Sequence, residues 1–408
     1  MAEDKKDLDR ALRTLKRQEV EKLVKDLVRI PSHSEVPTQE KEVAHFLHEF
    51  LQDEGVASKL RPVAKDRPNV IAMAEGAGDG RSLMLNGHTD TVPVFDMDIP
   101  PFSPRVDKGR LYGRGALDMK GGLGAMAMTL VALRRSKVSL AGDLYLTAVV
   151  GEERKSEGTE DIVENGPRAD MAIVGEPTDL EIQPSHRGLE WLNVHFYGKA
   201  AHGGQADRGL NAISMAAKFV NEVESNYLPV LRARKSKHTL PSTLNLGVIK
   251  GGQQPSSVAD HCEIQIDRRW IPEENLQQVF EEFYAIFDKI KSQEPRFKAK
   301  LERDPRNMLS MTHVPNVVKR DHPIVRSLGK AVKDQTGKPA KITTFWGWTD
   351  AALLTHYAKM PTVVFGPGGA GAHARTEYVL TDDLLKCARI YTQTAFEVCG
   401  TASRPKRR

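Results

Sequence analysis

The sequence predicts an α/β protein in which a mostly parallel sheet is flanked by helices and a smaller α+β domain is inserted into the chain. Four short apolar runs end in glycine or polar residues, as buried parallel strands do. A helical segment separates the first two runs. Before the fourth run lies a region in which hairpin-like strands alternate with helices. A chain of 408 residues with 40% hydrophobic content can bury a large core, and this length favours two domains.

The expected elements follow one another in a simple order. Apolar residues recur at roughly helical spacing over 12–30 and 40–51, which predicts two amphipathic helices. The run DMKGGLGAMAMTLVALRRS from Asp118 predicts a crossover helix between the first two strands. We expect the four strands at SLMLNGHTD from Ser82, DLYLTAVVGEE from Asp143, MAIVGEPTD from Met171 and MPTVVFGPG from Met360.

The region 188–302 alternates hairpin-like strands with two helices, which we expect at 211–224 and 273–290. The acidic and imidazole candidates that follow predicted strands resume only after this region, at His373. We therefore predict a discontinuous first domain, 1–187 and 303–408, with the second domain inserted at 188–302.

Composition and charge argue against several classes of protein. Three cysteines without C-x-x-C spacing predict neither a disulfide framework nor a sulfur metal site, so we expect a cytoplasmic protein. The net charge of +5 comes from 59 basic and 54 acidic residues that are scattered along the chain, so we expect no nucleic-acid partner. Charges interrupt every apolar cluster near the N-terminus, which predicts neither a signal peptide nor a membrane span.

Acidic and imidazole side chains gather at the predicted strand ends. In open α/β sheets, ligands and catalytic groups collect at the carboxyl ends of strands. Zinc accepts imidazole nitrogen and carboxylate oxygen, and two ions about 3.5 to 4 Å apart need one carboxylate that can bridge them. Five residues satisfy this requirement and are typical of a two-metal hydrolase, with Glu152 beside them: His88, Asp118, Glu153, Glu176 and His373.

Two other patterns have weaker support. Gly366, Gly368 and Gly371 spell G-x-G-x-x-G after a strand, but no apolar helix follows, so we expect no dinucleotide site there. His45 and His48 lie three positions apart on a helix without an H-E-x-x-H pattern, and we interpret them as part of a solvated helix face.

Eight stretches carry a resemblance to a known family: GHTDTVP from Gly87, GRGALDMKGG from Gly113, GEE from Gly151, GEPT from Gly175, AHGG from Ala201, TLNLGVIKGG from Thr243, DRRWIPEE from Asp267 and GPGGAGAHARTEYV from Gly366. The chain resembles, nearly end to end, the zinc-dependent deacylase family of acetylornithine deacetylase, succinyl-diaminopimelate desuccinylase, aminoacylase and carboxypeptidase G. Each stretch alone is weak evidence, whereas all eight in the family's order are a strong signal. A charged N-terminal extension departs from the family pattern.

The resemblance implies two zinc ions, for which Co²⁺ or Mn²⁺ could substitute. His88 and Glu176 would hold one ion, Glu153 and His373 the other, and Asp118 both, with a water or hydroxide completing the bridge. Asp90, two residues after His88, is placed to accept its other ring N–H and fix the tautomer. The alternative for Asp90 is an aspartate in a strand-end turn.

The resemblance also implies residues that act on the substrate. Glu152 would be the general base, although two adjacent glutamates can simply be a surface loop. His202 would stabilise the oxyanion from a neighbouring subunit of a homodimer, or it is an ordinary histidine of a lid domain. Asn245 and Arg269 would clamp the substrate carboxylate. Arg268 competes with Arg269, but strand neighbours point to opposite faces, and the D-x-R pattern favours Arg269.

Three functions remain open at this level. We favour an amidohydrolase that removes the acyl group from an N-acylated amino acid, because Glu176, where aminopeptidases have Asp, resembles the deacylase and carboxypeptidase branches. A dipeptidase or glutamate-type carboxypeptidase with the same metal machinery is the alternative. A catalytically silent binding protein would need a broken ligand set or a missing base, and the sequence has neither.

Overall fold

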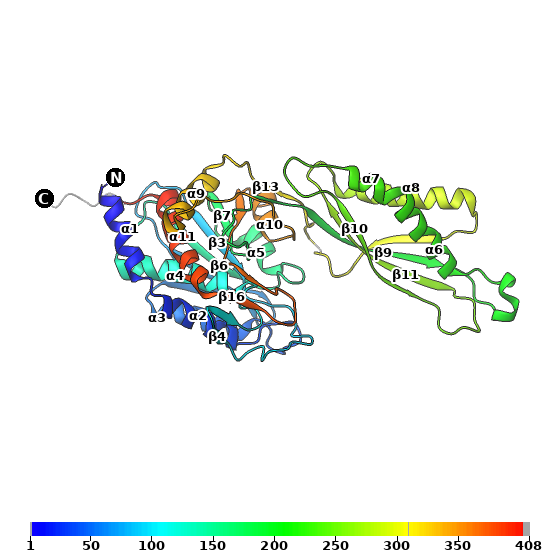
Figure 1. Ribbon diagram of the computed structural model, residues 1–408, viewed down its shortest axis with the longest axis horizontal. Coiled ribbons are helices and arrows are strands. Elements are labelled where there is room, and N and C mark those ends of the chain that lie inside the picture. The colour runs from blue at the N-terminus through cyan, green and yellow to red at the C-terminus, as the bar shows by residue number, and fades with distance from the viewer. Residues whose placement is uncertain (1, 309, 403–408) are drawn as a thin grey trace. The chain divides into compact units, whose positions relative to one another are not determined.

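The computed structural model describes residues 2–308 and 310–402, whose contacts divide the chain into two units (Figure 1). The first unit comprises Met1–Ser185, Asn316–Phe345 and Thr349–Arg408, and the second comprises His186–Pro315 and Trp346–Trp348. The second unit therefore runs past position 302, where the strand pattern of the sequence ends. The added segment pairs with the first strand of that unit, since Leu189 N donates to His313 O at 2.9 Å.

The central sheet of the first unit has the strand order β1-β2-β6-β3-β7-β14. The four expected strands are β3 (Leu83–His88), β6 (Leu144–Val149), β7 (Met171–Val174) and β14 (Thr362–Val364), and they are parallel to one another. The antiparallel pair β1 (Ala57–Ala64) and β2 (Arg67–Ala74) extends the sheet at one edge and was not identified from the sequence. The predicted α/β class with a mostly parallel sheet is confirmed.

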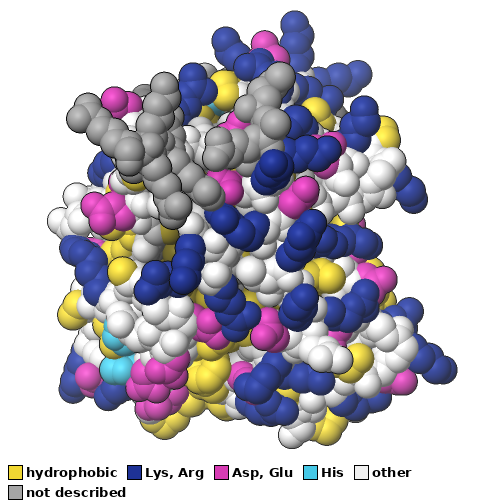
Figure 2. Space-filling model, turned by 90° about the vertical axis from the view of Figure 1, so that its left-hand side faces the viewer, with side chains coloured by type: hydrophobic (Ala, Val, Ile, Leu, Met, Phe, Trp, Pro, Cys, Tyr) yellow, Lys and Arg dark blue, Asp and Glu magenta, His cyan; other side chains and the backbone are white. Residues whose placement is uncertain are grey.

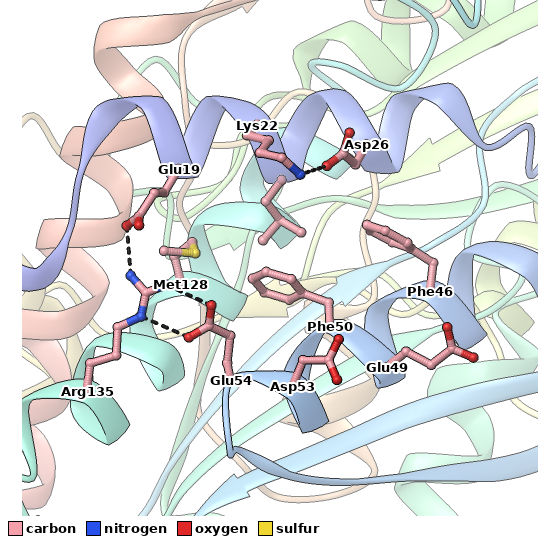
Figure 3. Close-up of a pocket in the computed structure, with 11 residues that line it drawn as sticks. Glu19, Lys22, Asp26, Phe46, Glu49, Phe50, Asp53, Glu54, Met128 and Arg135 are labelled. Carbon is pink, nitrogen blue, oxygen red and sulfur yellow. Dashed lines mark hydrogen bonds and ion pairs between the residues drawn. The ribbon is translucent and has the colours of Figure 1, made fainter.

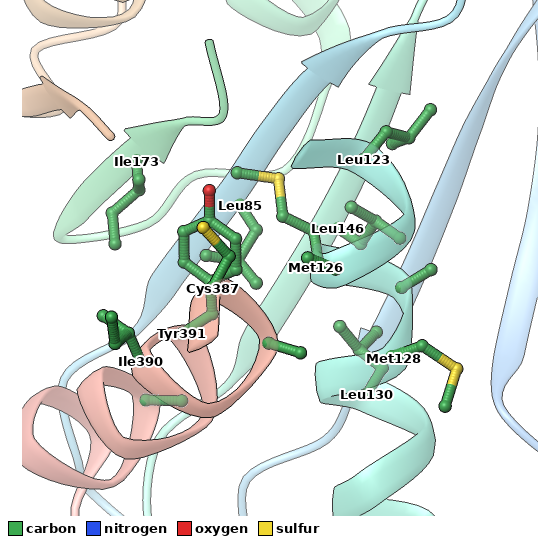
Figure 4. Close-up of a cluster of buried hydrophobic side chains, with 14 of the residues drawn as sticks. Leu85, Leu123, Met126, Met128, Leu130, Leu146, Ile173, Cys387, Ile390 and Tyr391 are labelled. Carbon is green, nitrogen blue, oxygen red and sulfur yellow. The ribbon is translucent and has the colours of Figure 1, made fainter. Parts of the chain in front are cut away.

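Helix α4 (Lys120–Ser136) is the crossover helix, and it is buried along almost its whole length. It packs beside α11 (Thr381–Cys399) against the sheet, where Met126 of α4 points toward Leu85 of β3 (Figure 4). Glycine lets its first turn approach the end of β7, because a Cβ at Gly122 would lie 2.1 Å from the carbonyl oxygen of Gly175. The other helices of this unit beyond the N-terminal region are α5 (Glu157–Asn165), α9 (Pro323–Thr336) and α10 (Ala351–His356).

The N-terminal region forms two helices where the sequence predicted one. Helix α1 spans Ala2–Thr14 and α2 spans Arg17–Arg29, so the helix expected over 12–30 is present as α2, but its expected start was too early because residues 12–14 belong to α1. The chain turns at Lys16, which has extended backbone angles of φ −109° and ψ 132°, while Leu15 is buried. The charged extension is thus a helix packed on the core. Helix α3 (Lys41–Asp53) lies close to its expected place.

A small sheet of order β15-β16-β5-β4 completes the first unit. Its strands are β4 (Arg105–Asp107), β5 (Arg110–Tyr112), β15 (Gly369–Ala370) and β16 (Tyr378–Leu380). It joins the segment before Asp118 to the segment around His373. Two further short strands, β8 (Ser185–His186) and β13 (Asn316–Val317), lie where the chain leaves and re-enters the first unit.

The second unit is an antiparallel sheet of order β10-β11-β9-β12 with helices on one face. The sheet contains β9 (Gly188–Tyr197), β10 (Thr243–Gly251), β11 (His261–Trp270) and β12 (Ala299–Arg303). Burial alternates along β11, so that Cys262, Ile264 and Ile266 are buried and the residues between them form an open face. The helices are α6 (Ala212–Glu222), α7 (Leu228–Ala233) and α8 (Leu276–Gln293), with short turns at Gly203–Arg208 and Val223–Tyr227.

Helix α8 begins three residues later than the sequence predicted. Asn275 caps it, since its side chain accepts from Gln278 N at 2.9 Å while the Gln278 side chain accepts from Asn275 N at 3.0 Å. This reciprocal pair satisfies two backbone donors at the helix start and so fixes the boundary.

Charged side chains of both signs share one face of the molecule, and the three cysteines are buried. Figure 2 shows one face on which lysine and arginine side chains are spread among acidic ones. No helix in the described ranges is both long and apolar enough to cross a bilayer. Cys262, Cys387 and Cys399 are buried free thiols.

Candidate metal centre

The strands β6, β3 and β7 are adjacent in the central sheet (Figure 1), and three of the candidate ligands lie at or just after their carboxyl ends. His88 is the last residue of β3, Glu153 follows β6 after a turn at Gly151 with φ +78°, and Glu176 follows β7. Asp118 immediately precedes the first turn of α4. His373 lies in the loop after β15, so it is nine positions beyond the end of β14 and not at a strand end. The structure brings all five side chains together.

Asp118 stands between the two histidines. Its Oδ1 lies 3.2 Å from His88 Nε2 and its Oδ2 lies 3.2 Å from His373 Nε2. Each imidazole also faces a glutamate, with His373 Nε2 3.0 Å from Glu153 Oε1 and His88 Nε2 3.5 Å from Glu176 Oε1. One carboxylate thus offers a separate oxygen to each of two histidine–glutamate pairs, which is the arrangement that two neighbouring cations require.

Burial makes this cluster costly without a cation. Burial raises the pKa of Glu152 and Glu176 well above the usual range, and that of Glu153 as well, with repulsion between the carboxylates adding to the effect. Hydrogen bonds to Asp118 and Glu153 raise the pKa of His373 to about 10. A divalent cation would offset this repulsion between the buried carboxylates.

The donor set fits divalent metal ions. Oε1 of Glu176 is buried, and the described part of the chain supplies no hydrogen-bond donor to it. Ligand atoms of His88, Asp118 and Glu153 lie within 4.8 Å of one another, as do those of His88, Glu152 and Glu176. Nitrogen and oxygen ligands this close suit zinc and similar borderline ions.

Asp90 approaches the ring of His88 through both its backbone carbonyl and its carboxylate. His88 Nδ1 lies 3.0 Å from the backbone carbonyl oxygen of Asp90 and 3.5 Å from its carboxylate. The carboxylate itself accepts from the backbone N–H groups of Glu152 and Glu153 at 3.2 and 3.0 Å. Asp90 therefore joins the end of β3 to the turn that carries both glutamates, and its carbonyl is the nearer partner for the imidazole.

A buried ion pair that sequence reasoning missed holds the loop of Asp118. The carboxylate of Glu377 accepts from Arg114 Nη1 at 2.8 Å and Gly115 N at 2.9 Å through one oxygen. Its other oxygen accepts from Leu117 N at 2.9 Å and Asp118 N at 3.1 Å. Because Glu377 follows His373 by four residues, it ties the loop of one ligand to that of another. Only the H-x-x-x-E spacing after His373 could have suggested it.

Cavity size does not identify this site. A cavity of about 330 Å³ lies among α2, α3 and α4, where Arg135 pairs with Glu19 and Glu54 and Lys22 pairs with Asp26 (Figure 3). A smaller cavity of about 220 Å³ adjoins the candidate centre. The chemistry of the ligand cluster therefore decides the assignment. The small cavity is lined by residues that include Asp90, Phe95, Glu153 and Arg154.

The remaining candidates lie in the second unit. Arg269 and Asn245 are on the open face of its sheet, and Arg269 makes two hydrogen bonds to Asp267 at 2.8 and 3.0 Å. Arg268 is fully buried on the other face, where it donates to Glu274 at 2.7 Å. His202 is exposed, and its Nδ1 accepts from Gly204 N at 3.1 Å. The alternation separates the two arginines, as expected for strand neighbours.

A family model described as Peptidase family M20/M25/M40 matches residues 84–397. The chain belongs to this family. It is 31% identical over 358 residues to an acetylornithine deacetylase from Myxococcus xanthus, covering 86% of this chain and 87% of the relative. It is 27% identical over 411 residues to a probable succinyl-diaminopimelate desuccinylase from Staphylococcus epidermidis, covering 92% and 97%.

The fold is also that of solved family members. A Bacillus subtilis protein described as a dinuclear metal-binding peptidase from the M20 family superposes with a TM-score of 0.70 at 18% identity, covering 95% of this chain and 99% of the other. The resemblance seen in the sequence is thus confirmed, as is the enzyme class, a family of hydrolases that act on amide bonds.

Proposed function

We propose that this M20 family member hydrolyses the amide bond of N-acylated amino acids, as its acetylornithine deacetylase and desuccinylase relatives are named for doing. The observation that carries the proposal is the position of Asp118, which turns one carboxylate oxygen to His88 and the other to His373, both at 3.2 Å. A shared carboxylate between two histidine–glutamate pairs is suited to a dinuclear centre.

Two Zn²⁺ ions per chain are the proposed cofactors, with Co²⁺ or Mn²⁺ as substitutes. His88 and Glu176 would hold one ion and Glu153 and His373 the other, with Asp118 shared. When bound, such ions make a water molecule acidic enough to attack at neutral pH and polarise the scissile carbonyl. The Bacillus subtilis family member, described as dinuclear, supports this number of ions.

Glu152 is the proposed general base. It belongs to the same buried cluster, with ligand atoms of His88, Glu152 and Glu176 within 4.8 Å of one another. A carboxylate held beside the ions but outside their ligand set can take a proton from the attacking water and deliver it to the leaving amine. Asp90 would steady this residue, because its carboxylate accepts from Glu152 N at 3.2 Å.

The second unit would supply substrate contacts. Arg269 has a planar guanidinium on the open face of the sheet, which suits a substrate carboxylate, and Asn245 lies on the same face. We propose His202 as the oxyanion donor, provided by the partner in a homodimer. The exposed position of His202 supports this, since a histidine that acts on a neighbouring subunit's substrate must be accessible.

A cytoplasmic location is supported by three buried free thiols.

A substrate panel tests the proposal. The zinc-loaded protein would be assayed with N-acetyl and N-succinyl amino acids beside dipeptides and C-terminal glutamate peptides, with Glu152→Gln as the control for contaminating hydrolases. We expect the highest kcat/KM on an N-acyl amino acid. Faster cleavage of dipeptides or glutamate peptides would favour the peptidase alternative, and no hydrolysis of any of them by a metal-loaded protein would refute the proposal.

A further inference from the structure

Two histidines face each other on the open face of the second unit's sheet. His195 lies on β9 and His261 on β11, and the registers Glu263↔His195 and His261↔Tyr197 put them on diagonal positions of the same face. Their Nδ1 and Nε2 atoms are 3.4 Å apart, and the rings stack with centroids 5.6 Å apart. Arg269 is eight residues along β11 from His261, which is ~27 Å on an extended strand. The pair is therefore separate from the proposed carboxylate clamp.

The separation of the two nitrogens suits a shared metal ion. Zinc–nitrogen bonds of about 2.0–2.1 Å that meet at a tetrahedral angle put the nitrogens about 3.4 Å apart. A good N–H···N hydrogen bond would be shorter, at about 2.9–3.0 Å. The 3.4 Å spacing thus fits two ligands of one ion better than a direct hydrogen bond.

Carboxylates lie on both sides of His195. Glu263 Oε2 is 3.9 Å from Nδ1, the nitrogen that faces His261, and the other oxygen of Glu263 is held by Gln265 Nε2 at 2.7 Å. On the far side of the ring, Nε2 is 3.5 Å from Glu302 Oε2, and Glu302 also pairs with Lys300. A carboxylate behind a histidine holds the proton on that nitrogen and leaves the other nitrogen free to bind a metal.

We propose that His195 and His261 form a further binding site for a borderline divalent cation such as Zn²⁺, with water, and Glu263 after a rotation of its side chain, completing the coordination. Two imidazoles and a carboxylate are zinc ligands, and open coordination positions are normal for a solvent-exposed site. A bound ion would cross-link β9 to β11 at the end of the sheet. It would do so whether or not the first unit binds two metals.

A Zn²⁺ titration of the full-length protein tests this site. Bound zinc would be measured against a chromophoric competitor for the unaltered protein, His195→Ala, His261→Ala and the matched control His238→Ala, an exposed histidine of the same unit. We expect each of the first two variants to bind one equivalent fewer than the unaltered protein, and His238→Ala to bind the same number. Glu302→Gln, which removes the carboxylate behind His195, should weaken binding of the extra equivalent about tenfold.

A measurement without substitutions guards against a variant that misfolds. Diethyl pyrocarbonate modification of the unaltered protein, mapped by mass spectrometry, should be slower at His195 and His261 when Zn²⁺ is present, and unchanged at His238. Equal zinc stoichiometry in all four proteins, or equal modification of both histidines with and without Zn²⁺, would overturn the proposal.

Discussion

Replacing Glu377 by glutamine should destabilise the first unit by about 3–5 kcal/mol, the usual cost of removing one partner of a buried ion pair. Arg114 and Glu377 are both 1% exposed, so water cannot solvate the charge that remains on Arg114. The four donors divide into two pairs, one on each carboxylate oxygen, at 2.8–3.1 Å. A glutamine oxygen can serve one pair, but its NH₂ group then faces the other pair of donors.

Thermal and denaturant unfolding would measure this change. At ~2–4 °C per kcal/mol for a unit of this size, Tm should fall by about 10 °C. Bound metal should fall too, because one pair of donors includes the backbone N–H of Asp118. The control is Asp98→Asn, which removes an exposed pair with Arg375, 56% and 66% exposed, and should cost about 1 kcal/mol or less. Glu377→Gln with unfolding and metal content equal to the unaltered protein would refute this role.

Three further predictions concern single side chains. Glu152→Gln should lower kcat by about 10²–10⁴ with metal content unchanged, and normal turnover would remove Glu152 from proton transfer. Arg269→Met should raise KM for carboxylate substrates about 10- to 100-fold, because it removes hydrogen bonds of about 1.5–3 kcal/mol. Arg268→Met should instead lower the free energy of unfolding, because Arg268 is buried against Glu274. The reverse pattern in steady-state kinetics and urea titrations would contradict both assignments. Burial lowers the pKa of Lys120 from 10.5 to about 7. The unfolded chain therefore binds more protons between these values, so the free energy of unfolding should rise from pH 7 to 9. Lys120→Met should flatten this rise, and equal pH slopes in urea titrations would contradict it.

Local patterns in the sequence identified the parallel strands and the side chains that follow them. A buried strand and the polar residues at its end are adjacent in the sequence. His88 and Glu176 could therefore be identified without knowing the fold. The hairpin of β1 and β2 was missed because Pro62, Pro68 and several charges interrupt its apolar pattern. Its signal was the turn at Lys65 and Asp66, where Asp66 has φ 58°.

Features that depend on distant contacts could not be predicted. Glu377 accepts hydrogen bonds from residues about 260 positions earlier, and no local pattern encodes such a partner. The same holds for His195 and His261, which meet only through the register of β9 and β11. The end of the second unit was placed too early because the segment after 302 lacks a strand pattern, although it packs beside β9.

The dinuclear arrangement is tested most directly by anomalous diffraction at the zinc edge from crystals of the zinc-loaded protein. We expect two strong peaks in the first unit, about 3.5–4 Å apart, one beside each carboxylate oxygen of Asp118, with His88 and Glu176 at one peak and Glu153 and His373 at the other. A single peak in the first unit, or two peaks that do not share Asp118, would contradict the proposed centre.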